Sequence, residues 1–184
     1  IVVTGSYVQD LTFMLPEFPT AGQTLIGEFN TGPGGKGSNQ AVAAARTGVS
    51  TAFIGVTGDD AFAQIAKQFH EGEGIDSRLA IHADKATGTA AILVNERGEN
   101  EIVVALGANN SLSAEDIPTS LVTEADILVS QLECNLEAVS YALKLAKAHQ
   151  VTTLLNPAPM RDDFPLEMLD SVDILVPNET EFAH

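Results

Sequence analysis

The chain has 184 residues, of which 45% are hydrophobic, a content typical of a globular protein with one substantial core. Its net charge of −16, with only nine Lys and Arg residues, argues against a nucleic-acid or membrane partner. The single cysteine, Cys134, excludes an internal disulfide framework and favours a reducing compartment, which we expect to be the cytoplasm.

Short β-branched runs alternate with amphipathic helical patterns along the chain. Five nearly continuous apolar runs are typical of strands buried on both faces of a sheet, and they lie at 1–4, 51–56, 126–130, 152–155 and 173–176. Between these runs, Asp60 and Asn135 are suited to cap helices, and the helix after Asn135 carries an apolar stripe. The alternation predicts an α/β fold in which helices flank a mostly parallel sheet.

Two segments, at about 11–33 and 87–107, depart from this alternation and predict a small β lid. One strand is expected at 23–29, and a hairpin is expected from 88–94 and 101–106, whose connecting turn contains Gly and Asn. A few strands with free edges are unstable alone, so the lid should cover a ligand, pair with another subunit, or do both. The alternative is that the strands pack on their own domain.

The run from Gly34 to Gln40 leads directly into an alanine-rich helix-forming segment at 41–46. Glycines permit positive φ angles, and the first amides of a helix are unpaired, so such a junction binds polar, oxygen-rich ligands. Gly32, Gly34 and Gly37 have the G-x-G-x-x-G spacing, but a dinucleotide fingerprint should follow the first strand, and the P-loop pattern fails. A glycine loop that only allows close packing is the alternative.

Further motifs follow in a fixed order: Gly5-Ser6 with Asp10, and then the segments 34–39, 57–60, 131–133, 156–159 and 177–181. In this order and spacing the chain resembles the N-terminal part of the ribokinase and phosphofructokinase-B family of carbohydrate kinases. The last three segments are more similar to ribokinases and deoxyribokinases than to adenosine kinases or fructokinases.

The resemblance implies a ribokinase-like fold and an ATP-dependent kinase that phosphorylates the 5-hydroxyl of D-ribose, with Mg²⁺ and, in the full-length protein, K⁺ as cofactors. It also implies a homodimer formed through the β lid. Residues 1–184 would be a truncated domain, because the family's catalytic Asp and the ATP-binding part are expected downstream. The chain alone is therefore predicted to be inactive. A 2-deoxyribose kinase, another carbohydrate kinase of the family, and a non-catalytic sugar-binding or assembly module are the alternatives.

Candidate sugar-binding residues follow from this resemblance; they are Asp10, Gly35, Lys36, Gly37, Asn39 and Glu133. Chemistry supports a sugar-binding role for Asp10 and Glu133, because each follows a predicted strand and its carboxylate can accept hydrogen bonds from neighbouring sugar hydroxyls. Taken alone, each could equally be a solvated carboxylate or a helix cap. Val8 departs from the family pattern, which often has Asn there, and an apolar side chain cannot bond a hydroxyl.

Asn178 and Glu181 lie three residues apart at the start of a predicted helix and therefore share one face. By resemblance they lie near the ATP phosphates, and Glu181 contacts the metal indirectly, through water, as suits an ion that keeps much of its hydration shell. The alternative is that Asn178 caps the helix and Glu181 interacts with the helix dipole.

Overall fold

Six parallel strands form the main sheet of the protein, for which a computed structural model describes residues 1–183. Their spatial order is β10-β9-β8-β1-β4-β5, and every neighbouring pair is parallel. Their bounds are β1 Val2–Thr4, β4 Ala52–Thr57, β5 Asp76–Ile81, β8 Ile127–Ser130, β9 Thr152–Leu155 and β10 Ile174–Leu175. Five of these strands were predicted from their apolar runs, and the mostly parallel sheet is confirmed. The edge strand β5 was missed because it begins with three polar residues.

Helices cover both faces of this sheet. Helices α1 (Lys36–Arg46) and α2 (Ala61–Gly72) bury one apolar cluster against β1 and β4, while α3 (Thr119–Thr123) and α4 (Leu136–Ala148) bury a larger cluster on the other face. The short elements are the 3-10 helices η1 (Gly107–Ser111), η2 (Ala114–Asp116) and η3 (Leu166–Ser171), and α5 (Glu179–Phe182) near the C-terminus. No helix within residues 1–183 combines the length and the apolar character that crossing a bilayer requires.

The two predicted caps lie at the starts of α2 and α4. The Asp60 carboxylate accepts a hydrogen bond from the Ala63 amide at 3.0 Å, and the Asn135 side chain accepts one from the Glu137 amide at 2.8 Å. Each cap satisfies an amide that has no partner within its helix. These local signals were sufficient to place both helix starts correctly.

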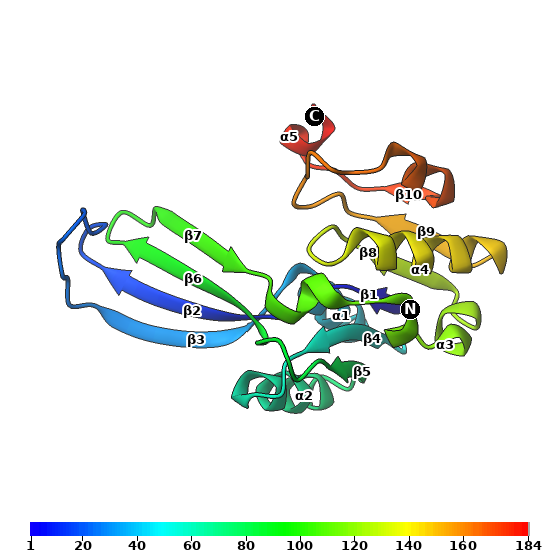
Figure 1. Cartoon of the computed structure of the whole chain (residues 1–184), viewed down its shortest axis with the longest axis horizontal. Coiled ribbons are helices and arrows are strands. Elements are labelled where there is room, and N and C mark those ends of the chain that lie inside the picture. The colour runs from blue at the N-terminus through cyan, green and yellow to red at the C-terminus, as the bar shows by residue number, and fades with distance from the viewer. Residues whose placement is uncertain (184) are drawn as a thin grey trace.

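A second sheet of four strands projects from the first as a separate layer, seen at the left of Figure 1. Its order is β3-β2-β6-β7, with the parallel pair β2–β6 between two antiparallel pairs. The bounds are β2 Val8–Leu15, β3 Glu28–Gly34, β6 Gly88–Asn95 and β7 Asn100–Ala105. We call this sheet the lid. The hairpin β6–β7 matches its prediction.

The lid strands β2 and β3 differ from the prediction. Strand β2 was not predicted, and the strand expected at 23–29 lies instead at Glu28–Gly34. Gly32, Pro33 and Gly34 argue against a strand, but β3 is at the sheet edge, where a proline costs no ladder hydrogen bond. The glycines of the G-x-G-x-x-G spacing therefore belong in part to a lid strand, which is incompatible with a dinucleotide-binding turn.

Candidate functional site

The N-terminus of α1 lies against the loop after β1, and its positive end faces a buried carboxylate. Gly35 occupies the N-cap position and provides no side-chain cap. Glu133 takes that role from the segment after β8: its Oε2 accepts bonds from the Lys36 amide at 2.8 Å and from the Ser6 hydroxyl at 2.6 Å. Glu133 is only 8% exposed, and a buried carboxylate needs hydrogen-bond donors. The two donors and the positive end of the α1 dipole stabilise its negative charge.

Two glycines of the predicted loop are required by close backbone contact. A Cβ atom added to Gly37 would lie 2.6 Å from the Ser6 nitrogen, and one added to Gly35 would lie 2.7 Å from the Val8 nitrogen. Gly35 also has a φ of 90°, a conformation that side chains disfavour. The glycines therefore let α1 begin directly against the chain between β1 and β2.

Asp10 follows the first strand, β1, as predicted. It lies within a further strand that was not predicted, the lid strand β2, where it pairs in register with Gly32. Its carboxylate lies over Gly34, where an added Cβ would be 2.4 Å from Asp10 Oδ2. Burial, and then the nearby negative charge of Glu133, raises the pKa of Asp10. The two carboxylates are thus near enough for their charges to interact, one on the lid and the other after β8.

Lys36 and Asn39 occupy the first turn of α1, three residues apart on one face. Lys36 is half-buried and Asn39 is exposed, and neither side chain has a hydrogen bond to another described residue. Between them, Ser38 is buried and its hydroxyl contacts His70 Nε2 at 2.9 Å. The Lys36 backbone amide contacts Glu133, while the side-chain donors of Lys36 and Asn39 have no hydrogen-bond partner among the described residues.

Asn178 and Glu181 cap α5 through a reciprocal pair of contacts. The Asn178 side-chain oxygen accepts a bond from the Glu181 amide at 2.8 Å, and both Glu181 carboxylate oxygens accept bonds from Asn178, at 2.9 and 3.0 Å. This is the capping arrangement that the spacing also predicted as an alternative. Among residues 1–183 no group of three or more His, Cys, Asp or Glu side chains is arranged to hold a metal ion.

A chain of amides, which sequence reasoning missed, connects the helix α1 to the segment before α5. Gln131 donates to Gln40 of α1 at 2.6 Å, Gln40 donates to Asn156 at 3.3 Å, and Asn156 donates to the Val176 carbonyl at 2.8 Å. These residues are far apart along the chain, so only the folded sheet brings them together. Ser6 was also missed as a partner of Glu133, although it belongs to one of the quoted motifs.

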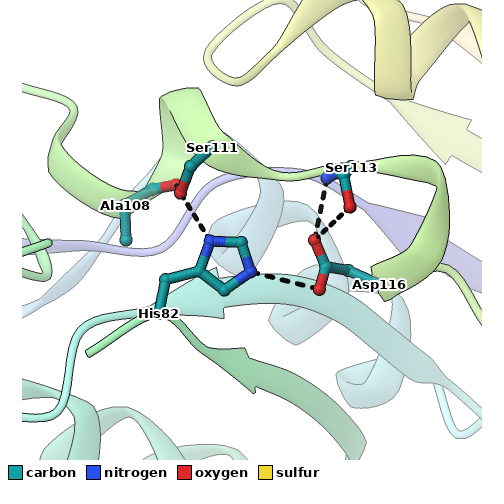
Figure 2. Close-up of polar contacts among 5 residues, drawn as sticks. All are labelled: His82, Ala108, Ser111, Ser113 and Asp116. Carbon is teal, nitrogen blue, oxygen red and sulfur yellow. Dashed lines mark hydrogen bonds and ion pairs between the residues drawn. The ribbon is translucent and has the colours of Figure 1, made fainter. Parts of the chain in front are cut away.

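A Ser-His-Asp contact occurs at η1 and η2, as Figure 2 shows. His82 Nδ1 lies 2.7 Å from the Ser111 hydroxyl, and His82 Nε2 lies 3.2 Å from Asp116 Oδ1. The Ser111 hydroxyl donates to the Ala108 carbonyl at 2.7 Å. A hydroxyl whose proton is bound to the backbone is not poised as a nucleophile, so this network holds the turn in place.

Comparison with known proteins is consistent with this geometry. The family described as "pfkB family carbohydrate kinase" matches residues 1–184. The ribokinase of Haemophilus influenzae is 40% identical over 98% of this chain and 60% of its own length, and the deoxyribokinase of Salmonella typhi is 37% identical over the same shares. A solved structure of Arabidopsis thaliana ribokinase, complexed with ribose and ATP, is 30% identical with a TM-score of 0.87, covering 99% of this chain and 61% of that one. The chain thus spans about 60% of the length of the curated relatives it matches.

Proposed function

The chain belongs to the pfkB family of carbohydrate kinases, and from this we propose that it is the sugar-binding part of an ATP-dependent kinase that phosphorylates the 5-hydroxyl of D-ribose. Relatives named ribokinase, at 40% identity, support the choice of sugar. The Arabidopsis structure with ribose and ATP supports both the substrate and the nucleotide.

The observation that carries this proposal is the pair of carboxylates at the N-terminus of α1. A sugar presents neighbouring hydroxyls that donate, and Asp10 together with the second oxygen of Glu133 can accept them. Lys36 and Asn39 supply donors from the first turn of the helix. A ring held at this point contacts the lid on one side and the main sheet on the other.

Phosphoryl transfer requires alignment of the nucleophilic hydroxyl and neutralisation of phosphate charge, with little covalent chemistry from the protein. We place ATP beside Asn178 and Glu181. The hydrogen bond from Gln40 to Asn156 connects α1 to this part of the protein. When bound, Mg²⁺ supplies positive charge to the phosphates. Each Glu181 oxygen already accepts a bond from Asn178, so this residue fits a contact through water and not a direct ligand set. No residue of this chain is assigned to K⁺.

The lid is proposed to cover the sugar, exclude water and form a homodimer contact. The edge strand β7 supports the dimer: Ile102, Val103 and Val104 are 52%, 72% and 44% exposed. Free apolar edges of this kind are normally covered by another chain or element. The proposed location, the cytoplasm, depends on the sequence composition alone.

Isothermal titration of the 184-residue chain with D-ribose tests the sugar site. We expect binding by the parent chain and its loss on replacement of either carboxylate. A coupled ATPase assay of the same chain should show no turnover, since the family's catalytic Asp is expected outside it. Failure of D-ribose and of every other pentose to bind would reject the proposal. Sugar binding without phosphorylation by the natural full-length protein would favour a non-catalytic module.

A second candidate substrate is 2-deoxyribose, favoured by Val8. Val8 is two residues before Asp10 on β2, so both side chains lie on the same face of the lid, and Val8 is 2% exposed. An apolar side chain there offers nothing to a hydroxyl, and a relative at 37% identity is named deoxyribokinase. Val8→Asn should raise the affinity for D-ribose relative to that for 2-deoxyribose. An unchanged ratio of the two affinities would remove 2-deoxyribose as a candidate.

A further inference from the structure

Four connections join the lid to the rest of the protein: 5–7 to β1, 35 to α1, 82–87 to β5 and 106 to η1. Figure 1 shows the lid extending from the body as one layer, with these connections gathered at its base. The position of Asp10 relative to Glu133 therefore depends on how the connections are held, because one residue is in the lid and the other follows β8.

One buried side chain, that of Asn109 in η1, fastens two of the connections. Its Oδ1 accepts a bond from the Tyr7 amide at 3.1 Å, and its Nδ2 donates to the Tyr7 carbonyl at 2.8 Å. The same nitrogen donates to the Leu106 carbonyl, also at 2.8 Å. Asn109 is 0% exposed, so water does not replace these contacts. Tyr7 belongs to the connection that enters β2, and Leu106 belongs to the one that leaves β7.

A third connection packs directly on the same amide. A Cβ added to Gly88, at the start of β6, would lie 2.4 Å from Asn109 Nδ2 and 2.9 Å from the Tyr7 carbonyl oxygen. Only glycine leaves room for this approach. Next to it, the Ala108 amide donates to the Ala86 carbonyl at 2.8 Å. Two connections are thus bonded to Asn109, and the third is bonded to the neighbouring Ala108 and enters β6 where Gly88 packs on Asn109.

The backbone of Asn109 extends this contact to the Glu133 side of the site. Its carbonyl accepts a bond from the Asn135 amide at 3.2 Å, and Asn135 follows Glu133 by two residues. On the lid side, Tyr7 precedes Asp10 by three residues. Asn109 therefore bridges the two segments that carry the carboxylates. The η1 turn is also held by His82, which contacts the hydroxyl of neighbouring Ser111 and is itself bound by Asp116, as Figure 2 shows.

We propose that Asn109 is a positioning residue, which fixes the lid, and with it Asp10, at the distance from Glu133 that sugar binding requires. Its role in binding rests on the proposed function, but its role in holding the lid does not. The amide is specifically suited because it offers one acceptor and two donors, and all three are used.

The substitution Asn109→Asp keeps the shape of the side chain but removes both donors, and it places a carboxylate against two carbonyl oxygens. It is therefore the test, with Asn109→Ala as a second variant in case the first does not fold. Asn110→Asp is the matched control, since Asn110 is the next residue and is exposed. Melting temperature establishes that each variant is folded.

Two measurements report on the proposal. Spin labels on Arg97→Cys in the lid and Lys144→Cys on α4, two exposed positions, give the distribution of distances between the lid and the body. Calorimetric titration gives the dissociation constant for D-ribose. We expect a broadened or shifted distance distribution and an affinity lower by roughly tenfold or more in a folded Asn109 variant, with neither change in the control. An affinity loss without a change in distances would overturn the lid role.

Distances and affinity equal to those of the control, in a folded Asn109 variant, would overturn the proposal entirely. If the parent chain binds no sugar, the proposed function fails, while the distance measurement still decides whether Asn109 holds the lid. If neither variant folds, hydrogen exchange on the parent chain under partial denaturation decides. The amides of Tyr7 and Asn135 both donate to Asn109. Exchange of these two amides through independent openings would contradict the bridge.

Discussion

The carboxylate of Glu133 caps the helix that begins at Lys36, 97 residues earlier in the chain, through a 2.8 Å bond to its backbone amide. A helix N-terminus is normally capped by the residue just before it, but here that residue is Gly35. The long-range cap places a buried negative charge at the start of the helix. One side chain thus combines this structural role with its proposed role in sugar binding.

Glu133→Gln should weaken both roles. The neutral side chain loses the charge-assisted bonds to Lys36 and Ser6, so we expect the free energy of unfolding to fall by about 1–2 kcal/mol and D-ribose affinity to fall roughly tenfold or more. Denaturant unfolding and calorimetric titration measure the two effects. Glu96→Gln, an exposed change in the turn between β6 and β7, should alter neither. Unchanged affinity in Glu133→Gln would argue against contact with the sugar.

Asp10→Asn should separate stability from binding. The pKa of Asp10 is raised by burial and by Glu133, so its ionised form is less favourable in the folded chain than in the unfolded one. Stability therefore falls as pH rises from the ordinary pKa of Asp through the raised value. At neutral pH the variant should melt at a higher temperature than the parent, yet bind D-ribose more weakly. Asp126→Asn, exposed before β8, is the control; a lower melting temperature for Asp10→Asn would contradict this prediction.

The buried His70 should make the chain sensitive to acid. It lies between the Ser38 and Ser77 hydroxyls, at 2.9 Å from each, and burial lowers its pKa to about 4. Its neutral form is favoured in the folded state, so stability is fully present above the unfolded pKa of about 6.5 and is lost as pH falls toward 4. The loss should reach at most about 3 kcal/mol.

His70→Gln should lower stability at pH 7 and flatten its decline between pH 6.5 and 4, measured by denaturant unfolding across that range. His149→Gln, an exposed change at the end of α4, should keep the decline of the parent chain. A decline of the same steepness in His70→Gln would assign the acid sensitivity to other groups.

The proposed lid dimer can be tested on β7. Ile102 and Val103 point to opposite faces of the strand, so Ile102→Lys with Val103→Lys puts a charge on each face and should yield monomers in sedimentation velocity. Leu166→Lys removes an equally exposed apolar side chain from η3, outside the lid, and should leave the dimer intact. A monomeric parent chain at all concentrations would rule out the dimer for this chain.

The main sheet could be predicted because its strands carry local signals. Strands buried on both faces form apolar runs, and Asp60 and Asn135 cap helices through contacts only two or three residues away. The lid was harder to predict. In β3 the proline and glycines argue against a strand, and only its place at the edge of a sheet makes them tolerable.

The candidate residues could be named from motifs, but their relations could not. Asp10 follows the first strand as expected, but its place within the lid strand β2 could not be predicted, because that strand depends on pairing with β6, about 80 residues away. Local patterns were enough to establish the alternation of strands and helices and the glycine loop, and the order of short motifs along the chain was enough to indicate the family, because none of these requires knowledge of the fold. The cap that Glu133 provides to α1 and the bridge that Asn109 forms between lid and body emerge only on folding, because a buried hydrogen bond between distant residues has no local signature.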